Sequence, residues 1–146
     1  SMIGLFNIFG TLTSGYLAQK FSKKLILSAI YLARGLVIAV FIFSPPSTFM
    51  AIFFGITFGF LWLSTVPPTM GLVGFIFGTK YIGLLYGIVF LSHQIGSFFG
   101  AYLGGVFHDL YGSYDYAWYI SIALSIFAGL IHLPIIEKQV KRLQTT

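Results

Sequence analysis

The chain has 146 residues, of which 58% are hydrophobic and 8% are charged, and its formal net charge is +5. A soluble domain carries about 25% charged residues, because its surface has to be hydrated. The low charge therefore excludes an ordinary soluble domain and predicts a protein whose surface mostly contacts the lipid bilayer. The absence of cysteine also excludes disulfides, thiol nucleophiles and thiolate metal sites.

Five apolar segments follow one another along the chain, and each is long enough to cross a bilayer, which takes about 20 residues of helix. They cover residues 2–19, 25–43, 49–77, 84–107 and 116–136. The third contains Pro67 and Pro68, and because proline removes a backbone donor we expect one long span with a kink there. The sequence thus predicts an all-α membrane protein with a five-helix transmembrane domain over residues 1–136.

The basic residues between the predicted spans fall in alternate links. They are Lys20, Lys23 and Lys24 in the first link, Lys80 in the third, and Lys138, Lys141 and Arg142 in the tail. Five crossings bring these three segments to one side, and the positive-inside rule places that side in the cytoplasm. We therefore expect the tail, residues 137–146, to be cytoplasmic. Because the basic clusters alternate with apolar runs, they are a topology signal and not a nucleic-acid-binding patch.

An internal similarity relates the ends of two spans. Residues 15–22 and 105–112 each have a glycine, a polar residue four positions on and a small residue seven positions on. The two segments are three spans apart, so they end on opposite sides of the membrane. This spacing indicates an inverted repeat of a three-helix unit, which is typical of secondary transporters.

Residues 15–24 resemble the cytoplasmic loop signature of the Major Facilitator Superfamily. The matching positions are Gly15, Leu17, Ala18, Lys20, Lys23 and Lys24. Gln19 stands where the family has an acid and Ser22 where it has a glycine, which suits the looser copy of the loop between the eighth and ninth helices. Residues 62–68 are similar to the family's tenth helix, and residues 92–101 to the eleventh helix of bacterial carriers of the monocarboxylate and oxalate/formate type.

This resemblance implies that the five spans are the last five helices of a twelve-helix carrier and form most of its C-terminal six-helix half. It implies a secondary active transporter in the inner (plasma) membrane of a bacterium, which moves a small solute by alternating access together with the missing N-terminal half. The implied substrate is a small organic anion such as a monocarboxylate, with no cofactor and no metal. No enzyme motif of the H-E-x-x-H, G-x-S-x-G or P-loop type occurs in the chain.

Small residues recur at every fourth position of the fourth span. Gly96, Gly100 and Gly104 form a ladder that lets another helix approach closely, and we predict that it packs helices together. The same ladder supports the alternative to a carrier, a self-contained membrane scaffold or assembly protein without transport activity. The chain enters an apolar run at once, without the charged region of a signal peptide, which favours a fragment of a longer carrier.

Arg34 is the tenth residue of the second span, and an arginine at this depth costs roughly 2.5–3.5 kcal/mol on insertion scales. One interpretation is a cation that binds an anionic substrate or forms a conformational ion pair. The other is a structural arginine that donates hydrogen bonds to backbone carbonyls, or an arginine whose side chain extends to the membrane–water interface. The ninth helix of the family is peripheral to the transport cavity, so the resemblance favours the structural interpretation.

Four further polar residues are candidate substrate ligands. They are Asn7 in the first span and His93, Gln94 and Ser97 near the middle of the fourth. The resemblance places the fourth span at the central cavity, where His93 would accept a proton or bond a carboxylate. A histidine at the midplane equally satisfies the backbone of a neighbouring helix, and both interpretations stay open. Asn7 shares a helical face with Thr11 and Ser14, and of that face it is the residue that we expect to contact the substrate.

Overall fold

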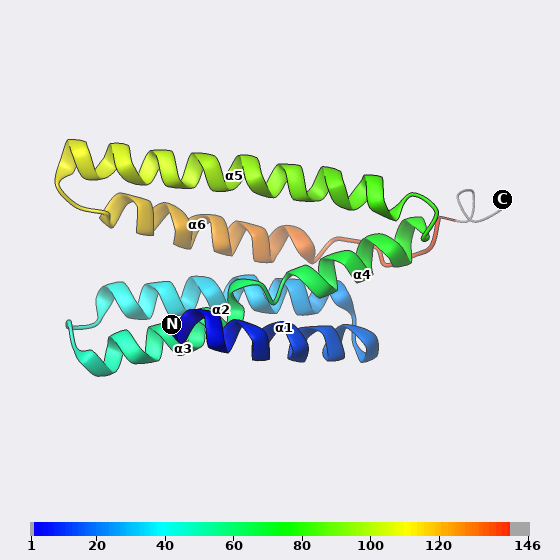
Figure 1. Ribbon diagram of the computed structural model, residues 1–146, viewed down its shortest axis with the longest axis horizontal. Coiled ribbons are helices and arrows are strands. Elements are labelled where there is room, and N and C mark those ends of the chain that lie inside the picture. The colour runs from blue at the N-terminus through cyan, green and yellow to red at the C-terminus, as the bar shows by residue number, and fades with distance from the viewer. Residues whose placement is uncertain (1, 141–146) are drawn as a thin grey trace.

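The computed structural model describes residues 2–140, and all regular secondary structure in that range is α-helical. The helices are α1 (Met2–Lys20), α2 (Lys23–Phe43), α3 (Thr48–Trp62), α4 (Val66–Phe77), α5 (Ile82–Tyr111) and α6 (Asp115–His132). They run back and forth along one long axis (Figure 1). The prediction of an all-α protein is confirmed.

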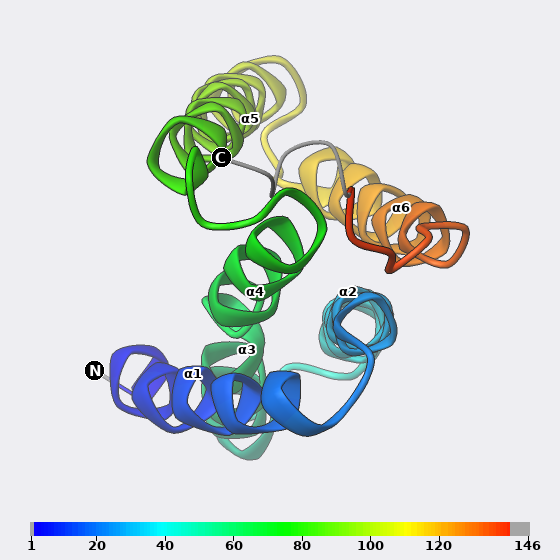
Figure 2. The same ribbon diagram turned by 90° about the vertical axis from the view of Figure 1, so that its right-hand side faces the viewer.

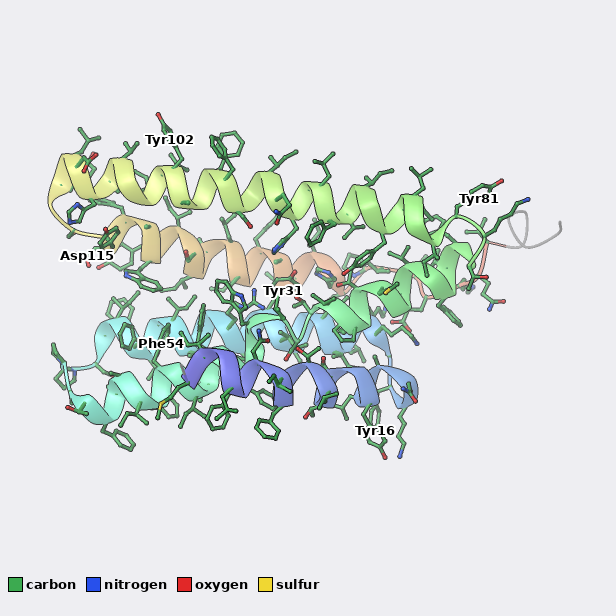
Figure 3. The ribbon with its side chains drawn as sticks, in the orientation of Figure 1. Tyr16, Tyr31, Phe54, Tyr81, Tyr102 and Asp115 are labelled. Carbon is green, nitrogen blue, oxygen red and sulfur yellow. The ribbon has the colours of Figure 1, made fainter. Side chains whose placement is uncertain are left out.

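The links that contain lysines lie at the same end of the bundle. The C-terminal ends of α1 and α4, the N-terminal ends of α2 and α5, and the tail after α6 are all found there, with Tyr16 and Tyr81 near that end in Figure 3. The α2–α3 and α5–α6 links lie at the opposite end, beside Asp115. The order of the helices thus agrees with the expected alternation, although Lys141 and Arg142 lie outside the described residues.

Four segments of the described chain are long and apolar enough to cross a membrane, judged by length and composition. They are α2, α5, α6 and the 30-residue stretch Thr48–Phe77 that contains α3 and α4. Five spans were expected, and the first of them, residues 2–19, is not among the four. α1 has 19 residues, but side chains such as Asn7, Thr11 and Gln19 make it less apolar than the others.

The third expected span, residues 49–77, is two helices and not one bent helix. α3 ends at Trp62 and α4 begins at Val66. Pro67 and Pro68 are the cause, because two successive residues without an N–H leave the carbonyls one turn earlier without helical partners. The expected kink is therefore a complete break.

The last two helices end at different residues from those expected. The span expected over 116–136 stops at His132, because Pro134 has no N–H to donate to the Leu130 carbonyl, which accepts from the Leu133 N–H at 3.1 Å in its place. The span expected over 84–107 is longer and continues until Gly112, which takes a left-handed φ of 70°. Glycine adopts this conformation without a steric penalty and commonly ends helices in this way.

Glycines bring two helix pairs into close contact. A Cβ atom added at Gly10 of α1 would lie 1.8 Å from the Phe60 carbonyl oxygen of α3, and one at Gly59 would lie 2.7 Å from the Cα of Ile3. α2 and α6 approach each other similarly at Gly129. In Figure 2, which looks along the bundle, α1 lies against α3 and α2 lies against α6. Such close approach gives membrane helices the van der Waals contact that holds them together.

The glycine ladder of α5 makes no such contact. Nothing lies within 4 Å of a Cβ atom added at Gly96, Gly100 or Gly104, and α5 has no buried residue. Within residues 2–140 no helix therefore packs against the ladder. Packing against helices outside the chain stays a prediction.

Gly10→Ala is expected to destabilise the protein, because the new methyl group would meet the backbone of α3 and not a flexible side chain. We expect a loss of about 1–3 kcal/mol, the usual effect of overpacking, measured by thermal unfolding of the complete polypeptide in detergent. Gly4→Ala on the same helix is the matched control, because its added atom has open space and alanine favours a helix. Equal effects of the two substitutions would contradict the close α1–α3 contact.

Candidate functional site

The break between α3 and α4 lies in the middle of the bundle (Figure 1). Val66 donates its N–H to the Leu63 carbonyl at 3.0 Å, which closes a tight turn in place of a continued α3. Pro67 and Pro68 follow in the first turn of α4 and have no N–H, so few amide groups need partners where α4 starts. The carbonyls at the end of α3, in contrast, need donors from elsewhere.

Arg34 of α2 supplies those donors. Its Nη2 atom donates to the carbonyl oxygens of Leu61 at 2.7 Å and Trp62 at 2.8 Å, and its guanidinium carbon lies 5.3 Å from the centroid of the Tyr31 ring. Its buried Nε has no hydrogen-bond partner in the part of the chain that the structure describes. These are the contacts of the structural interpretation, an arginine bonded to backbone carbonyls.

Asn7 of α1 reaches the same break. Its Oδ1 accepts a hydrogen bond from the Leu63 N–H at 3.1 Å, and its backbone carbonyl accepts one from the Thr11 hydroxyl at 2.8 Å. Two of the residues selected from the sequence, Asn7 and Arg34, are thus brought together at one turn. Sequence reasoning did not connect them, because their partners are backbone groups, which residue types do not reveal.

The other three candidate ligands lie on α5, away from the break. His93, Gln94 and Ser97 are all exposed. The Ser97 hydroxyl donates to the His93 carbonyl at 3.0 Å, and the His93 ring stacks on Phe90. α4 stands between α5 and α1 in the end-on view (Figure 2). Among the described residues, the polar face of α5 therefore contacts neither of the candidate residues at the break.

An open groove of about 630 Å³ lies between α1 and α4, at the end of the bundle that carries the lysine links. Small and apolar residues line most of it, and Gln19 and Lys23 are the polar residues on its walls. The Lys23 side chain crosses α4, so that its stem lies against Gly71 and its ammonium group is 5.2 Å from the Phe75 ring centroid. The groove thus has mostly apolar walls, with one positively charged residue, Lys23, among them.

The other two lysines of the loop motif point elsewhere. The Lys20 ammonium bonds to the Tyr16 hydroxyl and lies 4.4 Å from the centroid of that ring. Lys24 donates to the Leu133 carbonyl at 3.0 Å. Gly15, which begins the motif, faces Pro67 across the groove. Of the three lysines, Lys23 is the one that lines the groove.

A contact that sequence reasoning missed joins the tail to α2. The Glu137 carboxylate accepts hydrogen bonds from the Lys24 backbone N–H at 2.6 Å and the Ser22 hydroxyl at 3.1 Å. α2 has no acid in its first turn and no side-chain cap, although free N–H groups and the helix dipole favour negative charge there. The uncapped start of α2 was the signal in the sequence, but spacing along the chain did not identify the partner.

Long apolar helices that reverse direction along one axis, with one of them broken at paired prolines, define an all-α integral membrane protein. The chain belongs to the Major Facilitator Superfamily, whose family model matches residues 1–145. It is similar to the uncharacterized MFS-type transporter YcxA of Bacillus subtilis (strain 168), at 29% identity over 146 positions that cover 93% of this chain and 35% of that protein. No solved structure matches the chain.

The family expectation is thus confirmed. The chain spans 35% of the length of the relative that it matches, so the activity of the whole protein is a matter for proposal. The carrier subtype, the C-terminal position and the site residues also stay predictions.

Glu137→Gln is expected to destabilise the protein by about 0.5–2 kcal/mol, because it removes the negative charge at the N-terminus of α2 while nearly keeping the side-chain shape. The loss is measured by thermal unfolding of the complete polypeptide. Asp109→Asn is the control, since it also removes one carboxylate, but from an 86% exposed side chain whose ionisable neighbour is His108 at 3.9 Å. Equal shifts would show that α2 does not depend on the tail.

Proposed function

We propose that the protein is a secondary active transporter that moves a small solute by alternating access, and that this chain supplies helices eight to twelve of the carrier. The observation that carries the proposal is α4, a 12-residue helix that starts at a break in the middle of the bundle. Discontinuous helices mark the solute sites of secondary transporters, because a membrane tolerates irregular backbone only where protein covers it or a cavity adjoins it. Membership of the Major Facilitator Superfamily supports the same proposal.

The proposal includes the N-terminal half of the carrier as the partner of this chain, and α5 supports that part. α5 has 30 residues and none of them is buried, which is unusual for a helix that carries polar side chains. These are His93, Gln94 and Ser97, next to the glycine ladder. Because polar side chains facing lipid are costly, we propose that this face borders a solute pathway between the two halves.

The substrate that we propose is a small organic anion such as a monocarboxylate. A carboxylate within a membrane has to be paired or heavily hydrogen-bonded. The Arg34 guanidinium already donates to two carbonyls, whereas His93 is exposed on the proposed pathway and Lys23 lines the groove. We therefore propose that His93, together with Gln94 and Ser97, contacts the substrate and that Arg34 does not.

Single-cysteine labelling tests the proposed orientation, with a cytoplasmic tail in the inner (plasma) membrane of a bacterium, since this chain has no cysteine of its own. A membrane-impermeant maleimide is expected to label Ser22→Cys and Thr79→Cys only from the cytoplasm. It is expected to label Ser47→Cys and Ser113→Cys only from outside. Labelling of Ser47→Cys and Thr79→Cys from the same side would contradict the topology, because α3 and α4 together would no longer cross.

His93→Ala in the complete carrier is expected to raise the KM for labelled lactate by about tenfold or more, because a hydrogen bond to a charged group contributes about 1.5–3 kcal/mol. The dependence of uptake on pH is expected to change as well. His108→Ala is the control, because that histidine stacks on Tyr114 at the far end of α5.

Three results would count against parts of this proposal. Unchanged uptake and pH dependence in His93→Ala would remove His93 from the site. Transport of a sugar or a hydrophobic cation in place of monocarboxylates would remove the substrate class. Absence of any saturable uptake by the complete polypeptide would favour the membrane scaffold.

A further inference from the structure

The α3–α4 break is held from two other helices, by Arg34 on α2 and by Asn7 on α1. We propose that Arg34 is a positioning residue, which fixes the direction in which α4 leaves α3. It does this by hydrogen-bonding the last carbonyls of α3, and not by binding a solute.

The two sides of the break differ in the hydrogen-bond partners that their backbone groups need. On the amide side, the Val66 N–H bonds to the Leu63 carbonyl at 3.0 Å and the Thr69 N–H to the Thr65 carbonyl at 3.1 Å, and the two prolines between them have no N–H to satisfy. On the carbonyl side, the last turn of α3 has no following helix to supply donors. In apolar surroundings each unpaired carbonyl is expensive, so the break is stable only where a side chain donates to it.

Arginine is suited to this task by its shape. One nitrogen, Nη2 of Arg34, donates to the carbonyls of two successive residues, Leu61 and Trp62, which a planar group with fixed hydrogens does well. Two bonds from one rigid group set the orientation of the last turn of α3 as well as its position. The charge is balanced by the carbonyl dipoles and the Tyr31 ring. The three acids of the chain are not beside Arg34, because Asp109 lies near the end of α5, Asp115 at the start of α6 and Glu137 after α6.

The anchor behind Arg34 is the α2–α6 pair. Tyr31 lies beneath the guanidinium group, and its other neighbour is the His132 ring of α6, with 5.2 Å between the ring centroids. Figure 3 shows Tyr31 at the centre of the bundle. The column of Arg34, Tyr31 and His132 thus connects the break to α2 and α6, the helix pair with the most extensive contact in the described structure.

The orientation of α4 matters because α4 forms one wall of the groove. Pro67, Met70 and Gly71 line it from this side, and Gly15 of α1 lines it from the other. A change of angle at the break swings a helix of 12 residues and so widens or narrows the groove. That the width of the groove affects transport rests on the proposed function. The role of Arg34 at the break does not rest on it.

The first test is made with the complete polypeptide purified in detergent. One variant removes the Arg34 donor, and a second variant removes the break that leaves the α3 carbonyls in need of a donor. Arg34→Met removes every donor. Pro67→Ala combined with Pro68→Ala lets α3 continue into α4, so that the N–H groups of Thr65 and Val66 can bond to the carbonyls of Leu61 and Trp62 in place of Arg34. We expect Arg34→Met to lower the midpoint of thermal unfolding by roughly 5–10 °C in the native background and by less than half as much in the double-alanine background. Arg34→Lys, which keeps donors without the planar group, is expected to restore part of the loss. Equal losses in both backgrounds would overturn the proposal.

The second test measures the direction of α4 itself. Spin labels at Phe49→Cys on α3 and Met70→Cys on α4, both exposed, report the distance between the two helices by pulsed electron resonance. The distribution is expected to be narrow with Arg34, broad with Arg34→Met, and narrow again when the prolines are also replaced. An unchanged narrow distribution in Arg34→Met would overturn the proposal.

If Arg34→Met does not fold, the milder Arg34→Gln takes its place, since glutamine keeps one amide donor group. The expected and contradicting results of both tests are then the same as for Arg34→Met. Neither test uses a solute. Their failure would therefore leave the proposed transport function standing, and failure of the uptake assay would leave the role of Arg34 standing.

Discussion

A backbone carbonyl that loses its helical partner inside an apolar bundle has no water to replace it, and this constraint governs the middle of the structure. Pro67 and Pro68 end α3 early, and the carbonyls of Leu61 and Trp62 then depend on Arg34. Asn7 secures the turn from α1. Because the donors and acceptors come from different helices, the break takes its observed form only when α1, α2 and α3 are already packed together.

The frame that holds these residues in place is built from small side chains. α1 and α3 touch at Gly10 and Gly59, and the buried polar residues of the neighbouring interfaces include Ser14, Ser28 and Ser125. Serine behaves here as a small residue, because its hydroxyl can bond to a carbonyl of its own helix, as the Ser14 hydroxyl does to Thr11 at 3.0 Å. Close helix pairs without large side chains between them give the break a rigid support.

α5 stands in contrast to this frame. It contacts α4 and α6 but buries no residue, and its polar and glycine-rich faces are open. The close-packed part of the chain is α1 to α3 with α6, whereas α5 and the groove beside α4 are open, and we propose that this open part borders the solute pathway. In our proposal the break joins the two parts, since it orients α4 between the rigid frame and the pathway.

The sequence by itself determined the class of the protein, its alternating lysine links and the resemblance to its family, because apolar length, composition and charge are local properties. It also singled out Arg34 and Asn7 as polar residues in apolar spans. The tertiary structure alone decided that these two meet at one turn, that Glu137 caps α2, and that the glycine ladder of α5 stays open within the described chain. Those outcomes depend on which helix faces which and at what angle, and on backbone partners up to 113 positions away, which local composition does not encode.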